Sequence, residues 1–221
     1  MKKTLTLLTL TIVLSASHLP VIAQSDKWEI ETENTDTHIT FCVDTIELKT
    51  SAGLTLWYRQ PMHVPFTIEY DAMVCLQDST DRLSDLNCFW LATDPSVSDG
   101  SVLTNISRRR GIFTNASSLK LYYLGYGGNY NTTTRFRRYN AKPQPPLVKE
   151  YTDTAHLLRP NHWYHIRIEA TASRTKYFID EELLIDYADP TPLLYGWFGF
   201  RTTWSHCIIR SFRINPSLPR N

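Results

Sequence analysis

The feature that most constrains the fold of this chain is a series of short strand-like runs with almost no helical pattern between them. The runs are rich in β-branched and aromatic residues and are separated by Gly, Pro, Asn and Asp. They cover residues 28–33, 39–48, 54–58, 66–76, 88–93, 119–126, 133–139, 163–170, 176–179, 183–187, 196–202 and 207–214. No segment of about ten residues or more shows the 3.6-residue period of the helical crossovers that join parallel strands. We therefore predict an all-β fold, an antiparallel jelly-roll sandwich of two facing sheets.

Alternation within the runs indicates which side chains face the core. In the run 66–76, one strand face carries the apolar residues Phe66, Ile68, Tyr70, Ala72 and Val74. In the run 163–170, the predicted inward residues are Tyr164, Ile166, Ile168 and Ala170. The residues predicted to point outward from that run are Trp163, His165, Arg167 and Glu169.

Residues 1–23 have the three parts of a secretory signal peptide. Lys2 and Lys3 are followed by a mostly apolar stretch, residues 5–16, and by a small-residue cleavage site at residues 21–23. The apolar stretch is shorter than the ~20 residues that a membrane-spanning helix needs. We expect a secreted or periplasmic protein in which residues 24–221 form a single β-sandwich domain.

Charge and composition argue against several classes of protein. The chain has 23 Lys and Arg against 22 Asp and Glu, a net charge of +1, and loss of Lys2 and Lys3 would leave 21 against 22, or −1. A charge this close to zero argues against nucleic-acid binding and against a polybasic membrane anchor. The sequence has no nucleophile elbow, no phosphate-binding P-loop and no dinucleotide-binding fingerprint, so we expect no cofactor.

The four cysteines, Cys42, Cys75, Cys88 and Cys207, lie in or beside apolar strand-like runs. Their spacing contains no CxxC pair and no cluster with histidine, which argues against a structural zinc site. We expect small buried side chains with free thiols. One disulfide is the alternative, since exported proteins can form them.

The run after a glycine-rich turn, residues 125–139, carries the first group of candidate site residues. The strand period puts Thr133, Arg135, Arg137 and Tyr139 on one face and Phe136 on the other. Guanidinium groups grip carboxylates with two hydrogen bonds, and a tyrosine can stack on a sugar or move a proton. The pattern suits an anionic sugar, and a solvated face paired with acidic residues of a neighbouring strand is the alternative.

Two further stretches carry candidate residues. In residues 195–202, Trp197, Gly199 and Arg201 share a face, and an exposed Trp beside an Arg would form a platform for a sugar ring. Core packing with a β-bulge is the alternative. In residues 81–91, Asp85 and Asn87 lead into a buried strand and could orient an arginine or accept sugar hydroxyls, unless this loop only forms a capped turn.

Among the histidines, His165 shares its predicted outward face with Trp163 and Arg167, which makes it the best candidate for proton transfer. A structural histidine is the alternative. His162 and His165 fall on opposite faces of a strand and cannot share a metal ion there. Residues 94–100 lack the ligand rhythm of an EF-hand loop, so we expect no metal site.

The chain resembles concanavalin A-like jelly rolls in its strand order and in its ending. The ending consists of Gly-Trp-Phe-Gly-Phe-Arg at residues 196–201 and Arg-Ser-Phe-Arg-Ile at residues 210–214. That superfamily includes legume-type lectins, laminarinases, alginate and heparin lyases and keto-glycoside hydrolases. Residues 81–90 and 125–139 resemble more closely an uncharacterised family of secreted Bacteroidetes proteins found among polysaccharide-degradation genes. The acid pattern of laminarinase-type hydrolases, three acids at alternate positions of one strand, is missing.

The resemblance implies a carbohydrate-active protein with a polysaccharide or oligosaccharide partner, which the arginines suggest is anionic. The first hypothesis is a polysaccharide lyase acting on uronate-containing glycans, in which Arg135, Arg137 and Arg201 neutralise the carboxylate and Tyr139 or His165 moves the proton. The alternative is a non-catalytic, lectin-like module. Its predicted aromatic platforms are Trp197, Trp163 and Tyr126.

Overall fold

The computed structural model describes residues 22–216. Its strands are β1 (Trp28–Thr32), β2 (Thr37–Phe41), β3 (Thr45–Tyr58), β4 (Met62–His63), β5 (Phe66–Val74), β6 (Leu86–Thr93), β7 (Lys120–Gly127), β8 (Thr133–Asn140), β9 (Leu147–Tyr151), β10 (Tyr164–Ala170), β11 (Arg174–Ile179), β12 (Glu182–Ala188) and β13 (Tyr195–Pro216). Its short helical pieces are α1 (Ile22–Ser25), α2 (Ile106–Arg109), η1 (Phe113–Ser118), α3 (Gly128–Asn131) and η2 (Thr154–His156). All strand pairs are antiparallel, so the predicted all-β sandwich is confirmed.

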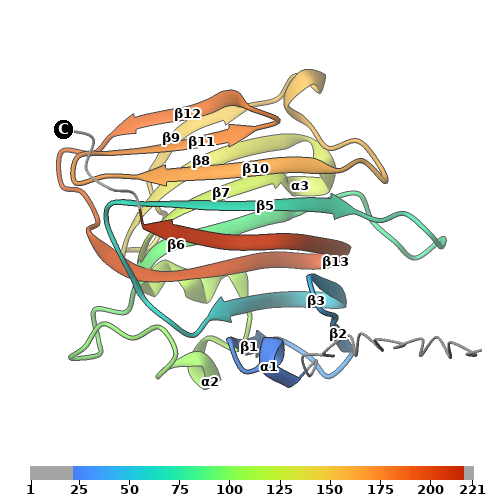
Figure 1. The fold of residues 1–221 in the computed structure, drawn as a ribbon, viewed down its shortest axis with the longest axis horizontal. Helices are drawn as coiled ribbons and strands as arrows, with labels where there is room; N and C mark the ends of the chain where they lie inside the picture. Colours follow the sequence, from blue (N-terminus) through green and yellow to red (C-terminus); the bar gives the residue numbers. More distant parts are fainter. Residues whose placement is uncertain (1–21, 217–221) are drawn as a thin grey trace, which may run out of the picture.

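Two long bent strands, β3 and β13, take part in both layers of the sandwich. Sheet I consists of β6, β7, β8 and β9, the first half of β13, the second half of β3, and β1. Sheet II consists of β5, β10, β11 and β12, the second half of β13, the first half of β3, and β2. In Figure 1, β5 and β10 lie in the near layer and β7 and β8 in the layer behind it. The register of β13 shifts between Thr203 and Ser205, where the strand passes from one sheet to the other.

The main core lies between the two sheets and follows the predicted alternation. The burial pattern of β5 alternates along its whole length, with Phe66, Ile68 and Tyr70 among the buried residues. Strand β10 alternates in the same way. Sheet I contributes the large rings of Trp90 and Phe136, which stack with centroids 5.8 Å apart.

A second, smaller core lies on the other face of sheet I. Residues 94–118 fold back over this face, and Val102 and Ala116 pack with Trp57, Phe89 and Trp197. Part of sheet I is therefore covered on both faces, which the period of its strands could not reveal.

A buried hydrogen-bond network fixes the covering segment to the sheet. The Glu31 carboxylate of β1 accepts hydrogen bonds from Trp57 Nε1 at 2.9 Å, Arg109 Nη2 at 2.7 Å and the Gly111 backbone N–H at 3.2 Å. A Cβ atom on Gly53 of β3 would lie 2.1 Å from the Gly111 carbonyl oxygen, so only glycine permits this close approach of the two backbones.

Several element boundaries differ from the sequence prediction. The run 39–48 is a hairpin of β2 and β3, because the chain turns at residues 42–44. The runs 196–202 and 207–214 belong to one strand, β13. Strand β9 was not predicted, since it lies at the edge of sheet I and four of its five residues are exposed.

The predicted signal peptide, residues 1–23, lies almost entirely outside the described residues. Between residues 22 and 216, no helix is both long and apolar enough to cross a membrane. The thiols of Cys75, Cys88 and Cys207 are buried and free, as predicted. Cys42 is exposed, contrary to the prediction, because it lies in the β2–β3 turn.

Candidate functional site

A cleft of about 760 Å³ lies on the face of sheet I that points away from sheet II. Strands β6, β7 and β8 form its floor, η1 lies along one side, and the proline-rich loop after β8 lies at one end. The lining brings together five residues singled out from the sequence: Asp85, Asn87, Arg135, Arg137 and Tyr139. Arg201 lies on the same face, and four other candidates do not reach the cleft.

Strand pairing explains how these side chains come together. Asn87, Gly125 and Arg135 are opposite one another on β6, β7 and β8, and Tyr123 is opposite Arg137. Residues opposite one another in adjacent strands point to the same face of a sheet. A Cβ atom on Gly125 would lie 2.3 Å from the Tyr123 hydroxyl, so the missing side chain makes room for the Tyr123 ring.

The three arginines of the lining are held in different ways. Arg135 forms an ion pair with Glu150 of the edge strand β9. Arg82 forms an ion pair with Asp85, with Nη2 2.6 Å from the carboxylate. Arg137 donates from Nη1 to the Pro145 carbonyl at 2.7 Å, and within residues 22–216 no carboxylate lies in ion-pair distance of it. Arg137 is therefore the cation of the lining whose charge is not already neutralised.

Two tyrosine hydroxyls in the cleft have no hydrogen-bond partner in the described part of the chain, those of Tyr123 and Tyr139. Burial raises the pKa of Tyr139 to about 12, and the nearby charges of Arg137 and Arg201 act in the opposite direction. Burial also raises the pKa of Tyr123 well above its usual range. At neutral pH both side chains are therefore protonated and can donate hydrogen bonds.

Asp85 and Asn87 form the polar end of the cleft near the β7–β8 turn. Asp85 accepts hydrogen bonds from Arg82 Nη2 at 2.6 Å, Ser84 Oγ at 2.9 Å and Asn87 Nδ2 at 3.2 Å. These bonds orient the Asn87 amide and leave its Oδ1 atom buried without a partner among the described residues. An unpaired buried acceptor is costly, and a donor from a bound molecule would satisfy it.

Arg201 lies behind the cleft instead of lining it. Its side chain is buried, and its Nη atoms donate to the Gly111 carbonyl at 2.6 Å and to Thr203 Oγ1 at 3.0 Å. Burial lowers the pKa of this guanidinium from its ordinary value. Because the bond to Gly111 crosses from sheet I to the covering segment, the side chain fixes a wall of the cleft and is not exposed to a ligand as the sequence suggested.

The two predicted aromatic platforms near the cleft are buried. Trp197 is 5% exposed, lies under the covering segment and donates from Nε1 to the Arg59 carbonyl at 3.2 Å. Tyr126 is 3% exposed and packs edge-on against Tyr164, with ring centroids 5.1 Å apart. Since Tyr123 and Gly125 face the cleft, alternation turns Tyr126 to the core between the sheets.

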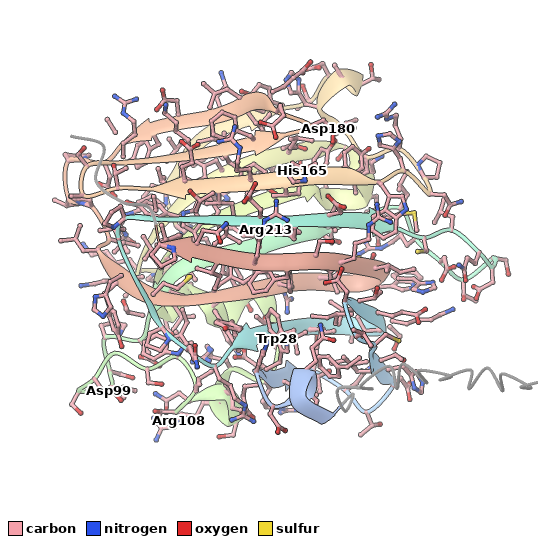
Figure 2. All side chains as sticks on the ribbon, viewed as in Figure 1. Trp28, Asp99, Arg108, His165, Asp180 and Arg213 are labelled. Carbon is pink, nitrogen blue, oxygen red and sulfur yellow. The ribbon has the colours of Figure 1, made fainter. Side chains whose placement is uncertain are left out.

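Trp163 and His165 belong to the other side of the molecule. Figure 2 shows His165 and Arg213 on the near layer, which is sheet II. His165 Nδ1 lies 2.8 Å from an Asp71 carboxylate oxygen, and the Arg210 guanidinium lies over the Trp163 ring at 4.0 Å. The outward assignment of these residues was right, but β10 pairs with β5 and so faces away from the cleft.

Tyr123, Phe113 and Arg82 are among the lining side chains that the sequence did not point to. Tyr123 could have been found, because it alternates with Gly125 on β7. Phe113 comes from the covering segment, for which no strand pattern exists. Within residues 22–216, no group of three or more histidine, cysteine, aspartate or glutamate side chains is arranged to hold a metal ion.

Comparison with solved structures shows the fold. A protein of unknown function with a galectin-like fold from Bacillus subtilis has a TM-score of 0.70 and 16% identity, over 90% of this chain and 93% of that chain. The carbohydrate binding module CBM66 from Bacillus subtilis has a TM-score of 0.58 and 15% identity, over 86% of this chain and 95% of that chain. A prokaryotic β-1,3-1,4-glucanase (lichenase) derived from a mouse hindgut metagenome has a TM-score of 0.55 and 12% identity, over 88% of this chain and 94% of that chain. The resemblance to concanavalin A-like jelly rolls is therefore confirmed at the level of the fold.

The comparisons of sequence lead to a family without a described activity. No relative was found among curated proteins. A family model matches residues 48–212, which include the floor of the cleft and most of the two bent strands β3 and β13. The chain belongs to this family, which is described as Domain of unknown function (DUF6250).

Proposed function

We propose that this protein binds an acidic saccharide in the cleft on sheet I, with the saccharide carboxylate at Arg137. The observation that carries the proposal is the unneutralised charge of Arg137 beside the unpartnered hydroxyls of Tyr123 and Tyr139. A guanidinium fork matches a carboxylate with two parallel hydrogen bonds, and hydroxyl donors suit the ring and hydroxyl oxygens of a sugar. The similarity in fold to a carbohydrate binding module and to a glucanase supports a saccharide ligand.

The lining suits a binding protein better than a glycoside hydrolase of the two-carboxylate type. Such hydrolysis needs an acidic pair roughly 5–9.5 Å apart on either side of the scissile bond. Asp85 is the one carboxylate that lines the cleft among the described residues, and it already accepts hydrogen bonds from Arg82 and Ser84. A binding site needs no second acid.

The test is isothermal titration calorimetry with oligosaccharides of polygalacturonate, alginate and hyaluronan, and with cello-oligosaccharides as neutral ligands. We expect binding to at least one acidic series, and we expect Arg137→Gln to weaken it by a charge-assisted hydrogen bond of ~1.5–3 kcal/mol, about ten- to a hundredfold. Arg174→Gln is the matched control, because Arg174 is an exposed, ion-paired arginine on β11 of sheet II. Equal losses for both variants, or binding to neutral oligosaccharides alone, would contradict the proposal.

A uronate lyase is the second candidate, and the observation that favours it is the Tyr139 hydroxyl, which has no hydrogen-bond partner among the described residues and is acted on by the charges of Arg137 and Arg201. In β-elimination a base takes the proton from the carbon beside the carboxylate, the electron pair of the broken C–H bond forms the C=C bond, and the C–O bond breaks as the leaving oxygen takes a proton from an acid. Tyr139 is suited to protonate that oxygen. The raised pKa of Tyr139 keeps it protonated, so it is a poor base for removing the carbon-bound proton. His165 cannot act as that base, because it lies on sheet II, away from the cleft.

Tyr139→Phe separates the two candidates, because it keeps the ring and removes the hydroxyl. A lyase would generate unsaturated ends that absorb ultraviolet light, and this variant would lose that activity while still binding. A binding protein would give no absorbance with any of the acidic polysaccharides, and the variant would lose at most one neutral hydrogen bond, roughly 0.5–1.5 kcal/mol.

We also infer from residues 1–23 that the protein acts outside the cytoplasm. Amino-terminal sequencing of the exported protein should begin at Gln24. A chain that keeps Lys2 and Lys3 and stays in the cytoplasm would contradict this inference.

A further inference from the structure

The most exposed aromatic side chains of the described chain gather around the cleft. They are Tyr130 at 65% exposure, Trp204 at 46% and Phe113 at 38%. Phe113 lines the cleft itself, and the direct neighbours Asn129 and Thr203 of the other two residues line it as well. Large exposed aromatic rings are costly in water, and their gathering at one place marks an interaction site.

Tyr130 and Trp204 are joined by a cleft residue, Arg82. The Arg82 guanidinium lies 4.8 Å from the centroid of the Tyr130 ring and 5.2 Å from that of Trp204. Its Nε donates to the Trp204 carbonyl at 2.9 Å, and its Nη2 is held by Asp85 at 2.6 Å. We call these three side chains the rim stack. One face of each ring contacts the Arg82 guanidinium. Because both rings are highly exposed, apolar ring surface remains open to a ligand.

The backbone holds both rings of the rim stack in an unfavourable conformation. Tyr130 has φ of 58° within a left-handed turn that includes Asn129 and Asn131, and Trp204 has φ of 44° where β13 changes sheets. Asparagine tolerates this region, but a bulky aromatic residue is strained there. Since neither ring is buried, packing in a core does not offset this strain.

The surface continues beyond the rim stack. A second hollow of about 160 Å³ is lined by Arg82 and Trp204 together with His38 and Lys49. Arg82 thus belongs to the walls of both the cleft and the hollow. A chain that occupies the cleft and leaves it past Arg82 meets the two rings and then this hollow.

We propose that the rim stack is an aromatic subsite for a saccharide chain that extends out of the cleft. The ligand is then an oligosaccharide or polysaccharide that is held along several sugar units, and not a single terminal sugar. The apolar faces of sugar rings stack on indole and phenol rings, and both kinds of ring are exposed here. This inference rests on the proposed function and adds the length of the ligand to it.

The experiment measures how the affinity of the whole protein for an oligosaccharide depends on the number of sugars in it. The probes are galacturonate, alginate and hyaluronan oligosaccharides of about two, four and eight sugars. We expect the longest to bind most tightly, and we expect Trp204→Ala and Tyr130→Ala each to weaken it about two- to tenfold while leaving the disaccharide unchanged. Arg137→Gln should weaken every length.

Trp163→Ala is the matched control, since Trp163 is also a tryptophan beneath an arginine, on sheet II. It should bind all lengths as the wild type does, and circular dichroism should show that every variant is folded. Equal affinity at all lengths, or no effect of the two rim substitutions, would overturn the rim subsite and leave the proposed function intact. Absence of binding to every probe would overturn both.

Discussion

Replacing Glu31 by alanine should loosen the segment that forms one side of the cleft. Glu31 and Arg109 are each about 4% exposed at the side chain, and the carboxylate also accepts hydrogen bonds from Trp57 and from the backbone of Gly111. Removal of the carboxylate leaves a buried guanidinium whose remaining acidic partner, Asp94, is 3.5 Å away. Breaking a buried ion pair from one side costs about 3–5 kcal/mol.

The same strand supplies the matched control. Glu29 is two residues away on β1 and pairs with Arg59 on the surface, where the side chains are 26% and 49% exposed. A surface pair contributes below about 1 kcal/mol. For a chain of this size a loss of 3–5 kcal/mol lowers the melting temperature by about 6–20 °C, whereas Glu29→Ala should lower it by at most about 4 °C.

Differential scanning calorimetry and chemical denaturation of the two variants measure this difference. Glu31→Ala should also weaken oligosaccharide binding, because Phe113 of the covering segment lines the cleft. Equal melting temperatures for Glu29→Ala and Glu31→Ala would refute the reasoning. They would mean that the network does not hold the covering segment to sheet I.

The thiols and the pH dependence of stability give two further predictions. A thiol reagent should modify Cys42 quickly in the native protein and all four cysteines after unfolding, because burial raises the pKa of Cys75 to about 11 and of Cys88 to about 12; fewer than four thiols in the unfolded chain would reveal a disulfide. Burial alone would raise the pKa of Asp189, but hydrogen bonds from Tyr122 and Arg138 hold it below its ordinary value of 3.8. Its ionised form therefore stabilises the fold above that value, and the stability is lost as pH falls through the lower folded pKa. The destabilisation by Asp189→Asn, measured by urea unfolding, should shrink between about pH 5 and about pH 2, and a constant difference would contradict this.

Part of the candidate site could be read from the sequence because strand alternation is local. Arg135, Arg137 and Tyr139 occupy alternate positions of β8, so any sheet that contains this strand places them on one face. Asp85 and Asn87 were found because they lead into a buried strand. All five line one cleft because β6, β7 and β8 are neighbours.

The missing parts depend on contacts that no local pattern encodes. Trp197 has the predicted face but is buried, because residues 94–118 cover it. Trp163 and His165 point outward as predicted, yet from sheet II, since sheet order decides which outward faces meet. Trp204 was overlooked because it lies at the bend of β13, and the sequence shows two runs where the structure has one strand.

The most direct test of the central claim is a crystal structure of the protein with a bound acidic oligosaccharide of about six sugars. We predict a sugar carboxylate in hydrogen-bond contact with Arg137 in the cleft on sheet I, and sugar rings against Tyr130 and Trp204 at the rim. A saccharide bound elsewhere, such as beside Trp163 and Arg210 on sheet II, would contradict the account.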